Sequence, residues 1–214
     1  MIRRIVLFFF LGLAAIDVFG QKPDSSSTTF VPLPVVFFTP ETRWGFGAFA
    51  FLSWRFEDES KDSRPSQFQL GAAYTLEDQI LAYLPFQRWW KDEQYSVFGE
   101  VGWYRYNYFF FGIGNDQPED FEELYGVDYP RIRLSAMKET TNDFYVGGRF
   151  VMADFTVTEL DAEGRLANTE ISGNDGGLTT GLGVLCNYDN RDNYFESYSG
   201  WYAEFTVDRH GGYI

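Results

Sequence analysis

Apolar and polar residues alternate with a period of two along most of the chain, which is the pattern of half-buried β-strands. Between Phe46 and Phe56 every even-numbered residue is apolar, whereas the odd-numbered positions include glycine, serine and arginine. This alternation predicts seven clear strands: Phe46 to Phe56, Gln67 to Thr75, Tyr95 to Trp103, Arg131 to Ala136, Phe144 to Met152, Leu178 to Asn187 and Trp201 to Val207.

Two further segments, Phe30 to Phe38 and Ile80 to Trp89, predict weaker strands because prolines interrupt them. Pro32, Pro34 and Pro85 lack the N–H group that a strand ladder needs, so we expect an edge strand or a bulge at each. The chain is therefore predicted to be all-β, with about nine antiparallel strands.

The connections between these strands differ in length. Gly112 to Asp128 and Leu160 to Gly176 read as long polar loops, whereas several other connections are tight turns. If the Phe30 to Phe38 strand runs outward, both long loops lie at the outer end and the Asp189 to Gly200 turn lies at the opposite, periplasmic end. Long outer loops and short inner turns are typical of outer-membrane barrels.

Charged residues on the polar faces of the strands favour a transmembrane β-barrel over a soluble sandwich. Aromatic residues gather near strand ends, where membrane barrels have interfacial girdles, and charges of both signs occur within the strands. A secreted soluble sandwich or barrel also alternates and stays open as an alternative. The candidate lumen-facing residues are Arg55, Glu100, Arg131, Arg133, Arg149 and Glu204.

The N-terminus has the features of a secretory signal peptide. Arg3 and Arg4 precede the apolar run Ile5 to Ala15, and small residues precede Gln21. The apolar run is shorter than the ~20 residues of a membrane-spanning helix. We therefore expect residues 1–20 to be removed, residues 21–29 to form a flexible polar lead, and residues 30–214 to form the barrel domain in the bacterial outer membrane.

Composition excludes several classes of function. The chain has 17 Lys and Arg against 31 Asp and Glu, a net charge of −14, which argues against a nucleic-acid partner. Cys186 is the single cysteine and His210 the single histidine, so one chain offers neither a disulfide nor the usual histidine-based catalytic and metal sites. We predict no enzyme activity, no cofactor and no metal site. An outer-membrane enzyme would need a nucleophile and a base in the barrel wall, and His210 is a poor candidate for that base.

Two motifs resemble the BamA/TamA family of outer-membrane barrels, also called the bacterial surface antigen family. The stretch YFFFGIGND is similar to a Y-F-G-x-G-N signature before a long loop, through Tyr108, Gly112, Gly114 and Asn115. The stretch DNRDNYFESYSG is similar to the periplasmic turn D-x-R-D-x-x-F-x-P-x-x-G, with Ser197 in place of the proline. Its matching residues are Asp189, Arg191, Asp192, Phe195 and Gly200.

The resemblance implies a role in the assembly or translocation of outer-membrane proteins, with outer-membrane lipids and client proteins as partners. It also implies a sixteen-stranded barrel and a V-R-G-[FY] loop motif, neither of which this sequence contains. We therefore expect the sequence to be the N-terminal part of a barrel cut near Ile214. A passive porin or solute channel, or a structural outer-membrane barrel, is the alternative function; the oligomeric state stays open.

The chemistry of the second motif is also that of a turn. We expect Arg191 to be held between Asp189 and Asp192, and Gly200 to take a positive φ before the next strand. The acidic segment after Gly112 contains carboxylates that could bind a cation, but it lacks the spacing of a calcium loop. We expect it to be a solvated outer loop.

Overall fold

The computed structural model describes residues 28–40, 42–56, 59–60, 63–118, 120–168, 171–193 and 196–211. The predicted signal peptide and nearly all of the predicted polar lead lie outside these residues. Thr29, the last residue assigned to the lead, is the first residue of a strand.

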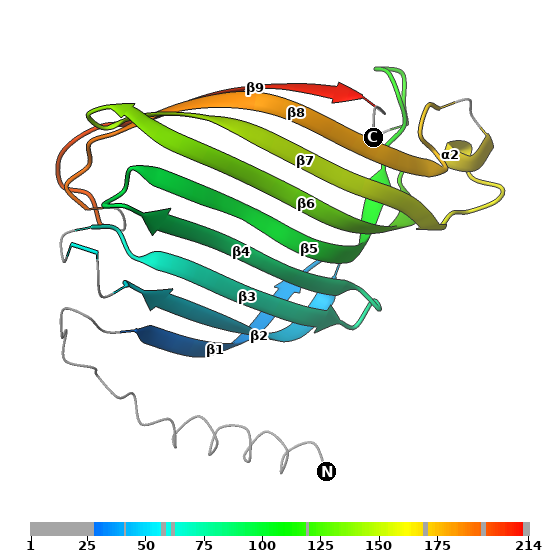
Figure 1. Cartoon of the computed structure of the whole chain (residues 1–214). Coiled ribbons are helices and arrows are strands. Elements are labelled where there is room, and N and C mark those ends of the chain that lie inside the picture. Colours follow the sequence, from blue (N-terminus) through cyan, green and yellow to red (C-terminus); the bar gives the residue numbers. More distant parts are fainter. Residues whose placement is uncertain are drawn as a thin grey trace, which may run out of the picture.

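The described residues form one antiparallel sheet of nine strands, each paired with the next along the chain (Figure 1). The strands are β1 (Thr29–Thr39), β2 (Arg43–Trp54), β3 (Ser66–Thr75), β4 (Ile80–Trp90), β5 (Tyr95–Phe110), β6 (Glu123–Thr141), β7 (Phe144–Glu159), β8 (Gly176–Asp189) and β9 (Tyr202–Gly211). One helical turn, α2 (Arg165–Asn168), lies between β7 and β8. No helix in the described part of the chain has the length and apolar character needed to cross a membrane.

All nine predicted strands are present, but the loop predicted from Gly112 to Asp128 is too long. Its last part, residues 123–128, belongs to β6 and pairs with residues 105–110 of β5. β7 likewise continues beyond Met152 to Glu159. The added lengths pair with neighbouring strands, so ladder hydrogen bonds compensate for their weak apolar alternation.

The prolines within strands lie in two different positions of the sheet, an edge strand and an interior strand. Pro32 and Pro34 lie in β1, which is an edge strand as predicted. Pro85 lies in β4, an interior strand, and the pairing of β3 with β4 keeps one register on both sides of it. The expectation of an edge or bulge at Pro85 was therefore wrong. The pairing with β3 is instead interrupted at Leu84 and Pro85, because proline has no N–H to donate, while Pro85 keeps its place opposite Glu100 of β5.

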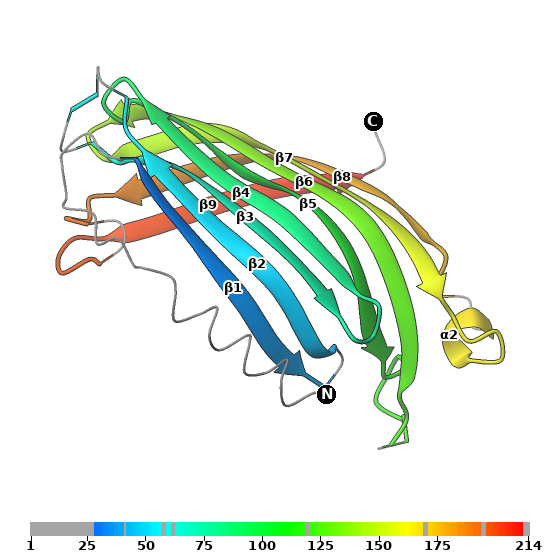
Figure 2. The ribbon, with the colours of Figure 1, turned by 90° about the horizontal axis from the view of Figure 1, so that it is seen from below.

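The sheet is curled into a trough but is not closed (Figure 2). β1 and β9 are its two edges, so the fold is an open antiparallel meander. Side chains from strands that are not neighbours meet on one face: the rings of Trp89 on β4 and Tyr145 on β7 lie 5.7 Å apart. That face is therefore the concave one.

The two ends of the trough carry different connections. The β5–β6 loop and the β7–β8 loop with α2 lie at one end, and the connection from Asn190 to Trp201 lies at the other (Figure 1). This relative arrangement is the one predicted. The buried cluster of Trp89, Met137, Tyr145 and Leu185, with Phe98 against it, lies on the concave face at the second end.

Candidate functional site

The concave face gathers charged side chains because residues at alternate positions of a strand share a face. Glu100 on β5 lies opposite Arg133 on β6, and Arg131 lies opposite Gly102. Arg149 on β7 lies opposite Ser135 on one side and Gly183 on the other. The register thus places these four predicted lumen residues on one face of three adjacent strands.

Glu100 and Arg131 form the central ion pair of this face. The guanidinium of Arg131 donates to the Glu100 carboxylate, with Nε to Oε1 at 3.1 Å. The Tyr104 hydroxyl lies within 2.7 Å of Glu100 Oε1 and accepts from Arg131 Nη2 at 2.9 Å. The Arg131 guanidinium also lies 4.5 Å from the centre of the Tyr104 ring. These contacts fix both charges against the wall.

Two hollows flank this ion pair. One, of about 310 Å³, contains Gln67, Gln87, Glu100, Arg133 and Arg149 among its lining residues. The other, of about 360 Å³, shares Arg133 and Arg149 and adds Asp208 and His210. Arg149 Nε lies 3.7 Å from Asp208 Oδ2. Charges of both signs therefore line a polar wall that suits hydrated ions or polar chain segments.

The remaining two lumen candidates lie near strand ends instead of mid-strand. β2 ends at Trp54, so Arg55 belongs to the following connection, where its Nε donates to the Ser63 carbonyl at 2.7 Å. Glu204 is the third residue of β9, opposite Asn187, and accepts a hydrogen bond from the Tyr202 hydroxyl at 2.9 Å. The prediction of Arg55 within a strand was wrong, because alternation does not locate the ends of a strand, whereas Glu204 does lie within β9, near its beginning.

Asp189 connects distant parts of the chain at the second end of the trough. Its side chain is only 2% exposed, and Arg191 donates to it from Nε at 2.7 Å and Nη2 at 2.9 Å. Arg64, from the β2–β3 connection, donates to Asp189 Oδ2 at 2.7 Å and to its carbonyl at 3.1 Å. Arg64 also lies 3.0 Å from a Glu93 carboxylate oxygen and 5.0 Å from the Trp89 ring.

Asp192 organises the backbone of the same turn. Its Oδ1 accepts from the amides of Ser199 at 3.1 Å, Tyr198 at 3.0 Å and Asn193 at 3.0 Å. These donors, the Ser199 amide foremost, lower the pKa of Asp192 below its ordinary value. Gly200 has φ of +100°, as predicted, and a side chain there would meet the Asn190 carbonyl. Phe195 lies outside the described residues.

The first motif divides between β5 and the loop that follows it. Tyr108 lies in β5, its ring 5.9 Å from that of Tyr125 and its hydroxyl 3.3 Å from that of Tyr129. Gly112 and Gly114 both have positive φ, and Asn115 is an exposed loop residue. The two motifs are thus at opposite ends of the sheet.

Glu123, in the acidic segment after Gly112, has a structural role. Its carboxylate accepts from the Arg165 amide at 2.8 Å and from the Leu166 amide at 3.3 Å, so it holds α2 against β6. Glu123 is 8% exposed, so it does not belong to the solvated loop that was expected. Within the described ranges, no group of three or more His, Cys, Asp or Glu residues is arranged to hold a metal ion.

Sequence reasoning missed Arg64, Tyr104 and Asp208 as members of these clusters. Tyr104 and Asp208 have the correct parity for the concave face, and that parity was a usable signal. Arg64 lies outside any strand, and its partner Asp189 is 125 positions away. Only the curl of the sheet brings those two residues together.

The fold and this site define an open antiparallel meander with a charged concave wall. The chain matches no protein-family model, no curated protein and no solved structure.

Proposed function

We propose that this chain forms part of the wall of an outer-membrane β-barrel, with the convex face toward lipid. The observation that carries this proposal is the distribution of polarity between the two faces. The Glu100–Arg131 and Arg149–Asp208 ion pairs lie on the concave side. Large apolar side chains on the convex side are exposed, and the ion pair on that side, Arg105–Asp128, lies toward the end of the sheet that carries the β5–β6 loop. A water-soluble sheet would bury its apolar face.

The convex apolar side chains extend across the sheet. Val101 is 49% exposed, Leu182 55% and Val184 61%, and each lies on a strand with neighbours on both sides. Other exposed members of this face are Phe46, Phe68, Leu70, Trp103, Leu134, Val146, Leu178, Phe205 and Val207. So large an apolar surface needs a partner, and hydrocarbon is the partner that an antiparallel meander with this pattern fits.

Aromatic residues border this face at both ends. Trp44 packs against Phe38 at one end, with ring centres 5.5 Å apart, and Trp90 stacks on Tyr95 at the other, at 5.7 Å. Trp44 and Trp54 are ten positions apart on β2. That length is about 33 Å along a strand and about 25 Å along the membrane normal at a tilt of roughly 40°. The spacing fits an apolar band between two interfacial girdles.

Within this class, we propose a role in outer-membrane protein assembly or translocation. It rests on the resemblance to the BamA/TamA family in the two motifs, at Tyr108 to Asn115 and Asp189 to Gly200. The free edges of β1 and β9 are compatible with pairing to further strands or to a client strand.

A passive porin or solute channel is the second candidate, and the charged concave wall favours it. Arg133 lines both hollows, and neither an ion pair nor a hydrogen bond joins its side chain to any other described residue. In a conducting pore such a cation would set ion selectivity.

The experiment that separates these roles is depletion of the protein in the bacterium that encodes it. An assembly role predicts that outer-membrane proteins fall as a group while their precursors accumulate. A channel role predicts unchanged outer-membrane composition and slower uptake of small hydrophilic solutes. Recovery of the native protein in the salt-soluble fraction without detergent would contradict both.

Conductance of the purified protein in a planar bilayer provides the matched variant test. Arg133→Glu should shift selectivity toward cations if the concave face lines a pore. Arg43→Glu is the control, because Arg43 lies at the turn between β1 and β2 and faces Glu77 at 3.6 Å. Equal selectivity in both variants would exclude conduction along this face.

A further inference from the structure

We propose that the convex face at the end of β4 and β5 binds an anionic phospholipid. Its phosphate would lie between Arg88 and Lys91, and an acyl chain would lie in the adjacent groove. The proposal rests on the membrane location proposed above, and it adds a specific lipid site to it.

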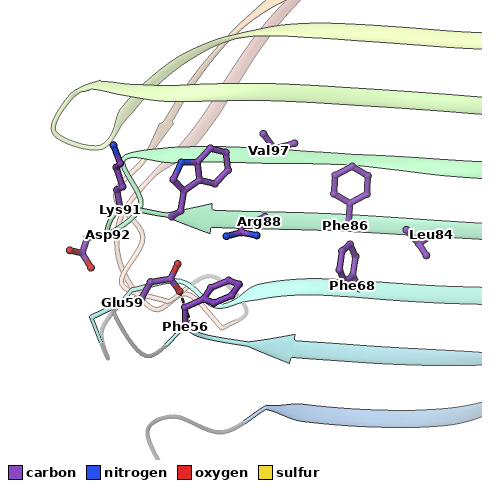
Figure 3. A pocket seen from close by; sticks show the side chains of 10 residues that line it. Phe56, Glu59, Phe68, Leu84, Phe86, Arg88, Lys91, Asp92 and Val97 are labelled. Atoms are coloured by element: carbon purple, nitrogen blue, oxygen red, sulfur yellow. Dashed lines mark hydrogen bonds between the residues drawn. The ribbon is translucent and has the colours of Figure 1, made fainter.

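The groove has an apolar floor (Figure 3). Its volume is about 880 Å³, and Phe68, Leu84, Phe86 and Val97 line it. The rings of Phe68 and Phe86 lie side by side, with centres 6.1 Å apart. These side chains point to the convex face, where the register pairs Leu84 with Val101 and Phe86 with Gly99. A hydrocarbon chain fits such a surface.

Two cations, Arg88 and Lys91, line one end of this groove, and a third, Lys138, lies beyond it at Tyr95. Each lies over an aromatic ring. The Arg88 guanidinium is 4.6 Å from the Phe56 ring and 6.0 Å from the Trp90 ring. The amino groups of Lys91 and Lys138 are 5.4 Å and 5.6 Å from the Tyr95 ring. None of these three cations forms an ion pair with a residue in the described part of the chain.

The two acidic residues at the groove take part in other contacts. Glu59 Oε2 accepts from the Phe56 amide at 3.1 Å, and Asp92 Oδ1 accepts from the Ser60 amide at 3.0 Å. Both carboxylates thus hold the backbone of the β2–β3 connection. The cations keep their positive charge available for an outside anion.

The position of these cations favours an anionic lipid over a soluble anion as the bound ligand. Cations beside lipid-facing apolar residues extend toward the headgroup region, and the Trp90–Tyr95 pair indicates that interfacial level. A basic cluster there attracts anionic lipid headgroups. A zwitterionic lipid carries a phosphate too, but its own amine compensates the charge.

The test reconstitutes the full chain in phosphatidylcholine vesicles and measures quenching of tryptophan fluorescence by brominated lipid. The brominated fraction is either phosphatidylglycerol or phosphatidylcholine at equal mole fraction. Trp90 lines the groove, and Trp90→Phe identifies its share of the signal. We expect the wild-type protein to associate about fivefold more strongly with the brominated anionic lipid, the preference that one cation near the surface gives.

The double variant Arg88→Gln/Lys91→Gln should abolish this preference, so that both brominated lipids quench equally. The matched control is Arg43→Gln/Arg105→Gln, which removes two cations at the opposite end of the sheet, where they face Glu77 and Asp128. The control should keep the preference. Lys91→Gln alone should give an intermediate value, which covers the case in which the double variant does not fold.

Equal quenching of the wild-type protein by both brominated lipids would overturn the lipid site and leave the membrane proposal standing. A preference that survives in the Arg88 and Lys91 variant would also overturn it. Absence of quenching by either lipid would overturn the membrane proposal itself and the lipid site with it.

Discussion

Asp189 is the residue on which the β8–β9 connection depends. Its nearly buried carboxylate faces two guanidinium groups, Arg64 at 2.7 Å and Arg191 at 2.7 Å. Removal of Asp189 would leave the two guanidinium groups close together, with the Glu93 carboxylate, 3.0 Å from Arg64, as the remaining anion. Arg64 and Arg191 are partly exposed, so solvent screens part of that cost.

Asp189→Asn should therefore lower the free energy of unfolding by about 2 kcal/mol, less than the value for a fully buried pair. The measurement is the urea midpoint of the protein refolded in detergent or vesicles. Glu196→Gln is the control, because it makes the same chemical change in the same connection, at an exposed residue. A midpoint equal to that of the control would contradict this role for Asp189.

The Asp192 carboxylate should make the stability of the same turn depend on pH. The amides of Ser199 and Tyr198 donate to its carboxylate and hold its pKa below the ordinary value. A carboxyl whose pKa is lower in the folded state stabilises that state above its unfolded pKa, and the effect is lost as pH falls through the folded pKa. We therefore expect the turn to loosen below about pH 4, the unfolded value for aspartate.

Hydrogen exchange at the Ser199 amide, followed from pH 6 to pH 3 and corrected for intrinsic rates, measures this loosening. Protection should decrease toward acid in the wild-type protein. In Asp192→Asn it should be low throughout and independent of pH. Constant protection in the wild-type protein across this range would contradict the assignment.

At this scale the sequence predicted local chemistry and missed distant partners. The positive φ at Gly200 followed from its place in a tight turn before a strand. The Arg64–Asp189 ion pair did not follow, because it depends on how far the sheet curls between β3 and β8. Residue parity predicted a shared face for Glu100, Arg131, Arg133 and Arg149, but not their partners Tyr104 and Asp208.

Among the elements, the strands were predictable because successive side chains of a strand point to opposite faces. The alternation is clearest where one face is wholly apolar, as in β2. It fails in residues 123–128, where acidic and aromatic residues mix, and there pairing with β5 extends the strand. That pairing is a property of two segments, so one segment's pattern cannot reveal it.

The convex position of Val101 gives a test of what surrounds the central strands. Val101 is 49% exposed on β5, and Leu76 is 61% exposed in the β3–β4 turn. Arginine on a lipid-facing strand near the bilayer centre costs about 2–4 kcal/mol and far less near the interface. In water, substitutions at either exposed site should change stability by no more than about 0.5 kcal/mol.

We expect Val101→Arg to destabilise the protein in vesicles by about 2–4 kcal/mol, and Leu76→Arg to have little effect. Urea unfolding of the two variants in phospholipid vesicles measures the difference. Equal stability of both variants would mean that water, and not lipid, covers the convex face.

At the scale of the whole molecule, the sheet has two faces of opposite character. The concave face carries the Glu100–Arg131 pair and a small cluster around Trp89, and the convex face carries exposed apolar side chains between aromatic borders. The described strands form an open sheet with two free edges, so we expect further strands to pair with β1 and β9. The same polarity supports both candidate functions, assembly and conduction.

Site-directed spin labelling in vesicles measures which face of the sheet contacts lipid and which contacts water. In a Cys186→Ala background, single labels at Val184 and Phe205 report on the convex face, and labels at Thr179 and Glu204 report on the concave face. We expect apolar oxygen to increase the relaxation rate of the convex labels most. A water-soluble nickel chelate should increase the relaxation rate of the concave labels only. Free access of the nickel chelate to Val184 and Phe205 would contradict this expectation.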